Sequence, residues 1–487
     1  MHRIAAAAVV AAILISLPTL FVRPAVAQVD GQEANQGDGG AASAEDGADG
    51  GLISLSDIRE NAAPIPWYQR ALSILGLGVI IALGWAISEK RGAIPWRVVG
   101  WGLSLQLVFG LFVLKTDIGK AIFEGLNTLV TKLLGFTGEG SEFIFQNLTG
   151  AESPWIVTFA FGVLPTIIFF SSLMAVLYHL GLMQKIVQVI AGLMQKTMGT
   201  SGSETLSVAA NIFVGQTEAP LLVKPFVDKM TRSELNAVMV GGFATVAGGV
   251  LAAYVKMFEG VFSDMAGHLI AASVMSAPAA MVIAKVMMPE TEESPTASGA
   301  KMTVEKIDTN VIDAAARGAG EGLMLALNVA AMLLAFIALV ALANFVLGLP
   351  SEAINALAGG DVVPVLTMER ILGWVFWPLA FVMGVPMQDC TAVATLLGEK
   401  IVLNEFVAYA HLADSLKAGT ELSYRSVVIA TYALCGFANF GSIAIQIGGI
   451  GGIAPERRGD IAKLGLRAMI GGTLAACMTA TVAGALL

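Results

Sequence analysis

Long apolar runs restrict the fold of this chain more than any other feature of its sequence. Several of them, residues 71–88 and 234–258 among them, reach the roughly 20 residues that an α-helix needs to cross a bilayer. Only 13% of the 487 residues are charged, whereas a soluble domain carries about 25%. Because a spanning segment must satisfy its own backbone groups, we expect an all-α polytopic membrane protein.

The first 66 residues differ in composition from the rest of the chain. His2 and Arg3 form a basic start, residues 4–17 are apolar, and Ala25-Val26-Ala27 matches a signal-peptide cleavage pattern. Residues 1–27 are therefore predicted to be a signal peptide, with an uncleaved first membrane helix as the alternative. Residues 28–66 begin with a stretch rich in Gly, Ala, Asp and Glu, and are predicted to form a disordered acidic tail.

The remaining chain divides into four predicted parts. They are N-terminal scaffold helices (67–180), a first repeat (181–289), a connection with the sixth span (290–366) and a second repeat (367–487). We expect about eight transmembrane helices, at residues 71–88, 98–114, 155–180, 234–258, 268–288, 321–347, 423–447 and 461–486. Amphipathic stretches predict interfacial helices at 117–145, 183–198 and 368–385, and residues 351–364 are expected to form an exposed loop.

Two stretches carry polar residues deep within apolar sequence. The first, residues 201–230, has Gln216-Thr217-Glu218 at its middle, and the second, residues 386–412, has Asn404-Glu405. Such groups must be satisfied by protein, water or ligand. Each limb of the first stretch has about 12 residues, or ~18 Å as helix, which reaches only mid-membrane. We therefore predict two re-entrant hairpins, with Pro220 starting the second limb of the first one.

An internal repeat relates these hairpins. The sequence GFATVAG (242–248) follows the first hairpin, and GFANFGS (436–442) follows the second. Met198-Gly199 and Met383-Gly384 precede the two hairpins in the same way. The order of interfacial helix, hairpin, glycine-interrupted span and plain span thus occurs twice. The first hairpin opens inward and the second outward, so the pattern predicts an inverted repeat whose tips meet near the membrane midplane.

Basic residues orient the predicted spans. With the mature N-terminus outside the cytoplasm, as a signal peptide requires, most Lys and Arg residues fall on the inner side, including Lys90, Arg91, Arg232, Arg457 and Arg458. Eight spans return the C-terminus to the outside. We therefore expect a multi-pass protein of the bacterial inner membrane with both termini in the periplasm.

The two tips suit a cation and a polar solute. Unwound backbone carbonyls and side-chain oxygens of Asn or Thr are hard ligands for a small cation such as sodium. The carboxylates of Glu218 and Glu405 can each accept hydrogen bonds from sugar hydroxyls or ring N–H groups. The alternative is structural: the carboxylates bridge helices, and the other polar side chains make packing hydrogen bonds. Lys400 and His411 fit a structural role better than a ligand-binding one.

Enzymatic motifs are missing from the sequence. It contains no HExxH, GxSxG or P-loop motif, and Cys390, Cys435 and Cys477 have no CxxC spacing. The four histidines are far apart, and the basic residues are scattered rather than clustered for nucleic acid. We therefore expect a transporter and no nucleic-acid partner. A membrane enzyme and a passive channel are the alternatives, and a channel would not require paired polar hairpins.

Residues 398–409, GEKIVLNEFVAY, resemble the signature G-x-K-x-x-x-N-E-F-V-A of the concentrative nucleoside transporter family. GQTEAP (215–220) and GFANFGSIAI (436–445) also resemble that family's first hairpin and the break in its seventh helix. The resemblance covers the chain from about residue 71 to the C-terminus. It implies a homotrimer, embedded in membrane lipid, that takes up nucleosides with sodium or protons.

The resemblance also implies roles for individual residues. The nucleobase would face Gln216, Thr217 and Glu218 with Val250 beside it, and the ribose would bind Glu405, Asn439 and Ser442. Phe437 would line the pocket, although a plain packing role is equally open. The sodium ion would bind Asn211, Thr245 and the backbone carbonyls of Val214 and Val246, where members of the family often have Ser in place of Thr245. GQTEAP resembles the sodium-coupled branch, and proton coupling is the alternative because Glu218 or Glu405 can titrate.

Overall fold

The computed structural model describes residues 65–145, 159–297, 308–420 and 422–487. The predicted signal peptide (1–27) and almost all of the predicted tail (28–66) lie outside these ranges, as does the start of the predicted third span. In the described ranges all regular structure is helical, and seven helices are long and apolar enough to cross a membrane. The chain is an all-helical, multi-span membrane protein.

The N-terminal helices pack around the later part of the chain. α3 (Trp67–Ala86) and α4 (Trp96–Lys115) both contact α13 and α20, whereas α5 (Asp117–Phe145) has the bounds predicted for the first amphipathic helix. A π-helical turn, η3 (Phe159–Val163), leads into α7 (Leu164–His179). Close contact requires glycine in α4, because a Cβ on Gly102 would lie 2.2 Å from Val282 Cγ2 of α13.

The first repeat begins with α8 (Leu182–Met198), which ends at the left-handed residue Gly199 (φ +72°). α9 (Gly202–Ala210) starts with a capping box between Ser201 and Glu204. A turn then leads to the short helices η4 (Ala219–Val223) and α10 (Lys224–Val227). The next span is split into α11 (Arg232–Ala244) and α12 (Gly248–Met257), and α13 (Met265–Met287) closes the repeat.

The second repeat follows α14 (Val311–Ala358), a helix of 48 residues. It starts with α15 (Met368–Val382) and a hairpin of α16 (Cys390–Val402) and α17 (Glu405–Lys417). The seventh of the eight predicted spans (423–447) is two short helices, α18 (Tyr424–Leu434) and α19 (Phe440–Ile453), and neither is among the seven described helices long enough to cross a membrane. A 3-10 turn, η5 (Pro455–Arg457), precedes α20 (Arg458–Leu486).

The exposed loop predicted for residues 351–364 is wrong over its first half. α14 continues to Ala358, although Pro350 lies inside it. The residues after Pro350 form helix readily, and the stop is supplied by Gly359, whose φ of +72° is left-handed. Only the part of this stretch beyond Gly359 is free of helix.

The caps of the two repeats keep a common spacing of 192 residues. The C-caps of the first helix in each hairpin, α9 and α16, are Asn211 and Leu403. The N-caps of α11 and α18 are Thr231 and Ser423, and the N-caps of α12 and α19 are Ala247 and Asn439. The two residues of each pair are 192 positions apart. GFATVAG and GFANFGS are two residues out of this register, because α18 ends earlier relative to its cap than α11 does. The helix caps therefore give the residue-by-residue correspondence of the two repeats.

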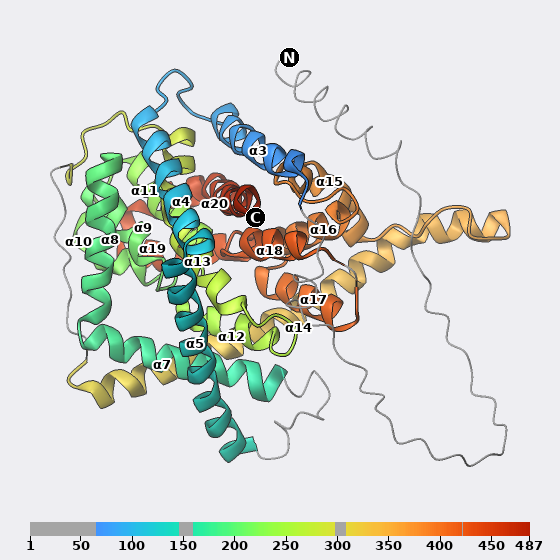
Figure 1. Ribbon diagram of the computed structural model, residues 1–487, viewed down its shortest axis with the longest axis horizontal. Helices are drawn as coiled ribbons and strands as arrows, with labels where there is room; N and C mark the ends of the chain where they lie inside the picture. The colour runs from blue at the N-terminus through green and yellow to red at the C-terminus, as the bar shows by residue number, and fades with distance from the viewer. Residues whose placement is uncertain (1–64, 146–158, 298–307, 421) are drawn as a thin grey trace. The chain divides into compact units, whose positions relative to one another are not determined.

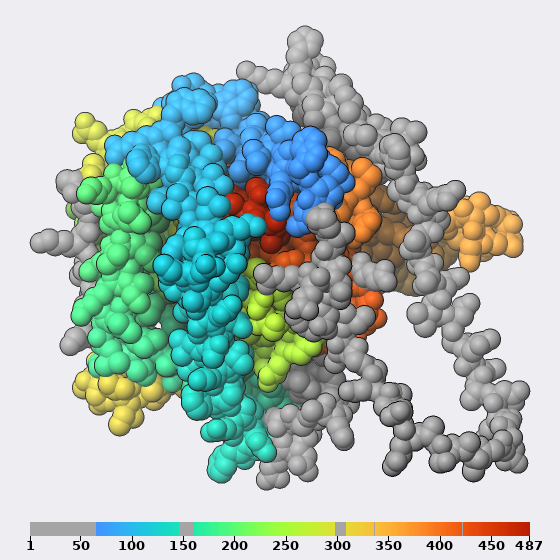
Figure 2. Space-filling view, viewed as in Figure 1, coloured from blue at the N-terminus to red at the C-terminus, as the bar shows by residue number. Residues whose placement is uncertain are grey.

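α13 and α20 form the centre of the described helices (Figure 1). α20 contacts α3, α11, α13, α18 and α19. In α13, 89% of the residues in its most apolar stretch are buried. By contrast, only 12% of the residues in the most apolar stretch of α14 are buried, and this helix packs mainly along α7. α4, α5 and α8 lie on the face of the molecule seen in Figure 2. The polar tips and helix breaks therefore lie among the most buried helices of the chain.

Candidate functional site

Glu405 lies at the tip of the second hairpin, between the two repeats. Asn404 ends the turn and caps α17 by accepting a hydrogen bond from the backbone N–H of Val407 at 2.9 Å. This cap places Glu405 at the first residue of α17, where it is only 5% exposed. Its Oε1 accepts from the Tyr254 hydroxyl at 3.0 Å, and its Oε2 accepts from Asn439 Nδ2 at 3.0 Å.

The break of the second repeat faces this carboxylate. Asn439 caps α19 because its Oδ1 accepts from the backbone N–H of Ser442 at 2.8 Å, which leaves its Nδ2 free to donate to Glu405. Ser442 is buried and Phe437 half-buried in the same segment. Gly436 has a φ of +131°, and a Cβ there would lie 2.7 Å from the carbonyl oxygen of Phe243. The two helix breaks therefore meet backbone to backbone.

Gln216 anchors the tip of the first hairpin to α19. Its Oε1 accepts from Gln446 Nε2 at 3.0 Å, and the same amide also donates to the backbone oxygen of Met239 at 3.1 Å. Thr217 packs closely on Gly449, since a Cβ there would lie 2.4 Å from Thr217 Cγ2. The first hairpin tip is thus held by the second half of the other repeat's broken span.

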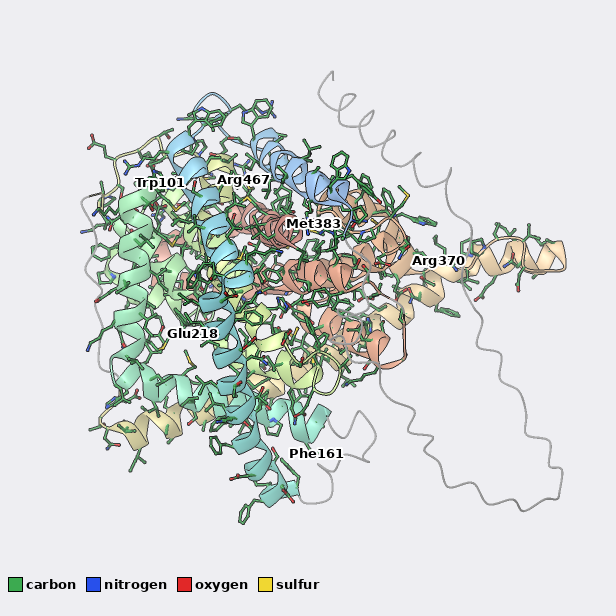
Figure 3. All side chains as sticks on the ribbon, viewed as in Figure 1. Trp101, Phe161, Glu218, Arg370, Met383 and Arg467 are labelled. Carbon is green, nitrogen blue, oxygen red and sulfur yellow. The ribbon has the colours of Figure 1, made fainter. Side chains whose placement is uncertain are left out.

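Glu218 differs from Glu405 in its surroundings. The residue is exposed, and Figure 3 labels its position. Its carboxylate folds back over Gly215, where a Cβ would lie 2.2 Å from Glu218 Oε2. Tyr178 and Glu321 are its electrostatic neighbours. The carboxylate of Glu218 therefore contacts its own turn, whereas that of Glu405 contacts the opposite repeat.

The contacts of the two tips are reciprocal. The first tip binds Gln446 of α19, and the second binds Tyr254 of α12, and these two residues are themselves 192 apart. Neither residue was predicted from the sequence to belong to the site. Each is a lone polar side chain in an otherwise apolar half-helix, which is the only sign of it in the sequence. Which distant residue such a side chain meets depends on how the two repeats pack against each other. Val250 is buried one turn before Tyr254 on α12, on the same side of the helix.

The residues predicted to bind sodium lie on two joined segments. Asn211 and Val214 belong to the turn after α9, while Thr245 and Val246 form the break after α11. The backbone N–H of Gly248 donates to the carbonyl of Phe213 at 3.0 Å and so ties the break to the turn. Thr245 is buried, and its hydroxyl donates to the carbonyl of Gly241 at 2.9 Å.

Asn211 provides the feature that best fits a cation. Its Nδ2 donates to the backbone oxygen of Ser207 at 3.2 Å, but its Oδ1 is buried and has no hydrogen-bond partner among the described residues. A buried, unpaired carbonyl oxygen is costly unless it binds something. A sodium ion, which prefers neutral and anionic oxygen ligands, would satisfy it. In the ranges the structure covers, no three His, Cys, Asp or Glu side chains form a metal cluster.

Lys400 and His411 have protein partners. The Lys400 ammonium is fully buried and donates to the backbone oxygen of Ala433 at 2.8 Å. His411 Nδ1 lies 3.0 Å from Glu399 Oε2 within the same hairpin. The Lys400 contact joins the second hairpin (hairpin 2) to α18, and the His411 contact lies within that hairpin.

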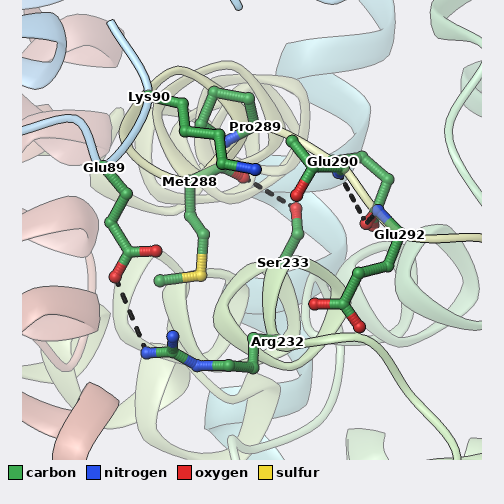
Figure 4. Close-up of a pocket in the computed structure, with 9 residues that line it drawn as sticks. Glu89, Lys90, Arg232, Ser233, Met288, Pro289, Glu290 and Glu292 are labelled. Atoms are coloured by element: carbon green, nitrogen blue, oxygen red, sulfur yellow. Dashed lines mark hydrogen bonds and ion pairs between the residues drawn. The ribbon is translucent and has the colours of Figure 1, made fainter.

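A separate pocket of about 170 Å³ lies between the loop after α3, the start of α11 and the residues that follow α13 (Figure 4). It is lined by residues of both charges, including the pair Arg232 and Glu89, whose Nη2 and Oε1 are 3.6 Å apart. Ser233 donates to the backbone oxygen of Met288 at 2.7 Å on its wall. The pocket contains none of the tip residues, so it is distinct from the candidate site.

Three family models match the chain in succession. The N-terminal model of the Na+ dependent nucleoside transporters matches residues 75–148, the nucleoside recognition model matches 160–260, and the C-terminal transporter model matches 268–484. Nucleoside cotransporters and related transporters align with most of the chain. The chain belongs to the concentrative nucleoside transporter family. It is therefore a member of a family of transporters and is not an enzyme.

Two relatives illustrate the similarity in sequence. An uncharacterized transporter of Bacillus subtilis, YutK, is 46% identical over 84% of this chain and 98% of its own length. The sodium/nucleoside cotransporter 1 of Mus musculus is 44% identical over 86% of this chain, which spans 64% of the mouse protein. The chain thus covers less than two thirds of that mammalian relative.

Solved structures agree with this family. CNTnw in an inward-facing, substrate-bound state has a TM-score of 0.77 and 43% identity, covering 85% of this chain and 97% of that one. A double variant of CNTnw in an outward-facing state has a TM-score of 0.79 and 43% identity, with coverages of 86% and 98%. The sodium dependence of the family implies sodium as the coupling ion.

Proposed function

We propose that this protein is a secondary active transporter that imports nucleosides across the bacterial inner membrane, driven by a sodium gradient. The observation that carries the proposal is Glu405, a buried carboxylate at a hairpin tip that contacts both repeats through Tyr254 and Asn439. A carboxylate has about four acceptor sites, so two remain for ribose hydroxyls after these bonds are made. A group that only bridged helices would not need to lie at a tip.

The architecture supports this role. We propose that α9 with η4 and α10, and α16 with α17, are re-entrant hairpins of an inverted repeat, and that the broken span of α18 and α19 completes eight spans. The common cap spacing and the reciprocal tip contacts favour this arrangement. The termini would then lie in the periplasm, and α5, α8 and α15 would lie along the membrane interface.

The substrate residues follow from the same arrangement. We propose that the nucleobase contacts Gln216, Thr217 and Glu218 beside Val250, and that the ribose contacts Glu405, Asn439 and Ser442 with Phe437 at the pocket wall. Gln216 and Glu405 already bond to the opposite repeat, so a solute between the tips would contact both repeats at once. Such a solute closes a site that neither hairpin forms alone.

Sodium coupling is favoured over proton coupling by Asn211. Its buried, unpartnered Oδ1 lies on the turn that is tied to the helix break at Thr245 and Val246. Oxygens from Asn211, Val214, Thr245 and Val246 would form the site. Proton coupling through Glu218 or Glu405 is the alternative, because both are carboxylates at the tips.

We also propose that the protein assembles as a homotrimer in membrane lipid. α14 exposes large apolar side chains along its length, and only 12% of the residues in its most apolar stretch are buried in one chain. Lipid alone would accept this surface, but its packing against α7 gives a rigid ridge suited to a partner subunit. Cross-linking of purified protein in nanodiscs, read by mass, tests the number of subunits.

Uptake into proteoliposomes tests the transport function. The purified full chain should accumulate radiolabelled uridine or adenosine when sodium is higher outside, and should exchange labelled for unlabelled nucleoside without a gradient. The exchange separates a carrier from an open channel, which shows no saturable counterflow. Uptake that follows a pH gradient and ignores sodium would replace sodium by protons, and absence of both uptake and exchange would contradict the proposal.

A further inference from the structure

The 192-residue correspondence allows the two helix breaks to be compared position by position. In the first repeat, Val208 of α9 packs on Gly241 of α11 so closely that a Cβ on Gly241 would lie 2.8 Å from Val208 Cγ2. Gly241 is one of the last four residues of α11, whose carbonyls have no partner within the helix. Its carbonyl accepts only the Thr245 hydroxyl from outside the helix among the described side chains.

At the matching place in the second repeat stands a lysine. The residues equivalent to Val208, Gly241 and Asn211 are Lys400, Ala433 and Leu403. Lys400 Nζ donates to the carbonyl of Ala433 at 2.8 Å, so the side chain from the hairpin again packs on the end of the half-helix. It does so here with an amine nitrogen, whereas the first repeat has an apolar side chain.

The side-chain oxygens near the two breaks differ in the opposite way: the first repeat has one where the second has none. The first repeat has the buried, unpaired oxygen of Asn211, and the second has Leu403, which has no polar side-chain atom. The first break therefore has a buried side-chain oxygen that no described residue pairs, and the second has a lysine at the helix end but no side-chain oxygen at that position. The C-terminal end of a helix carries a partial negative charge, which either a bound ion or an ammonium stabilises.

Two further observations connect the end of α18 and Lys400 with the hairpin that carries Glu405. Tyr409, in the same hairpin, donates to the carbonyl of Thr431 at 2.7 Å, one turn before the end of α18. Glu405 lies near enough to interact electrostatically with Lys400. Lys400 thus links the end of α18 to the hairpin whose tip carries Glu405.

We propose that the Lys400 ammonium is a tethered cation that performs at the second helix break the role that the sodium ion performs at the first. It is a positioning residue: it fixes hairpin 2 on α18 and so orients Glu405, without touching the substrate. The inference rests on the proposed sodium-coupled function. It implies that one sodium ion from solution, bound at the first break, accompanies each nucleoside.

Flux measurements on the unmodified protein provide the first test. Uptake of ²²Na and of labelled uridine into the same proteoliposomes should give a ratio of about one, and the Hill coefficient for sodium should also be about one. A ratio of about two, with uptake still driven by sodium, would overturn the inference and leave the proposed function standing. Uptake that does not depend on sodium would instead overturn the proposed function.

Substitution of Lys400 provides the second test. Lys400→Met keeps the chain length but removes the charge, so uridine affinity at saturating sodium should fall about tenfold or more. Lys400→Arg keeps a charged donor and should recover most of the affinity. In the absence of uridine, the stabilisation of Lys400→Met by sodium in thermal unfolding should match that of the unmodified protein, because the first break is intact.

Thr245→Val is the matched variant at the other break. It should lose the stabilisation by sodium and keep uridine affinity at saturating sodium closer to the original value. A merely structural Lys400 would lower thermal stability without this separation of sodium and uridine effects. Equal uridine affinity in Lys400→Met and the unmodified protein, or loss of the sodium stabilisation in Lys400→Met, would overturn the inference.

Discussion

At the scale of single residues, the site depends on polar side chains whose partners come from the opposite repeat. Glu405 was recognisable in the sequence because a carboxylate within apolar residues needs a partner. Tyr254 and Gln446 were not, since a lone polar group in a half-helix does not reveal which distant element it meets. The sequence therefore predicted which groups need partners but not which partners they have.

Glu405→Gln should weaken uridine binding while leaving the fold intact. The substitution keeps the shape but replaces charge-assisted hydrogen bonds, worth about 1.5–3 kcal/mol each, so affinity should fall about tenfold or more. Calorimetric titration of the purified protein measures this. Glu399→Gln is the control, because Glu399 is also buried in hairpin 2 but pairs with His411. An equal loss in both variants would argue against direct contact of Glu405 with substrate.

Thr245→Val should raise the sodium concentration needed for half-maximal uridine uptake, and change maximal uptake less. Valine has the volume of threonine but no hydroxyl, so it removes one proposed ligand. It also leaves the carbonyl of Gly241 without the hydroxyl that it accepts at 2.9 Å. Thr245→Ser keeps the hydroxyl and controls for this effect. If the valine and serine variants have the same sodium dependence, Thr245 is not a ligand.

At the scale of elements, the amphipathic helices were the most predictable part and the first hairpin the least. α5 has the predicted bounds because its apolar residues recur at helical spacing. The first hairpin has shorter limbs than expected, since α9 ends at Ala210 and prolines divide the second limb into η4 and α10. Its base is held instead by buried charges: Lys285 Nζ lies 2.7 Å from Glu204 Oε2 and donates to Ser233 Oγ at 2.9 Å.

Lys285→Met should destabilise the protein strongly through the base of the first hairpin. Lys285 and Glu204 are 4% and 1% exposed in their side chains, so the substitution strands a buried carboxylate, which costs about 3–5 kcal/mol. Thermal unfolding in detergent measures the change. The double variant Lys285→Met/Glu204→Gln removes the stranded charge and should recover part of the loss.

Lys256→Met is the control for an ion pair outside the core. Lys256 pairs with Glu259, whose side chain is 61% exposed, and such pairs contribute about 0–1 kcal/mol. This variant should unfold close to the temperature of the unmodified protein. A comparable loss in Lys256→Met and Lys285→Met would contradict the role given to the buried pair.

At the scale of the whole molecule, the two repeats meet at their tips and at their breaks. Gly248 ties the first break to the first hairpin turn, and Gly436 places the second break against the carbonyl of Phe243. A cation bound at the first break therefore lies in a segment that is continuous with the tip bearing Gln216. The prediction that the two tips meet rested on the repeated order of elements and on a motif alignment that is two residues out of register. In the structure each tip bonds to a half-helix of the opposite repeat.

Sodium and nucleoside should strengthen each other's binding by the same factor. A sodium ion that orders the first hairpin turn preorganises the tip beside it, so uridine affinity should rise with sodium, with a coupling of about 1–3 kcal/mol. Calorimetric titrations of uridine at several sodium concentrations, and of sodium at several uridine concentrations, measure both directions. Sodium-independent uridine affinity would contradict coupling through this segment.

The crossing of the hairpin tips also bears on the ancestry of the chain. Each tip bonds to the second half-helix of the other repeat, Gln216 to Gln446 and Glu405 to Tyr254. A primordial protein with one repeat would have had a tip and a half-helix that could not bond to each other. It would have completed both contacts only by pairing with a second copy of itself. A fusion of two such copies would place equivalent caps at one fixed spacing, as the 192 residues between the caps of this chain do.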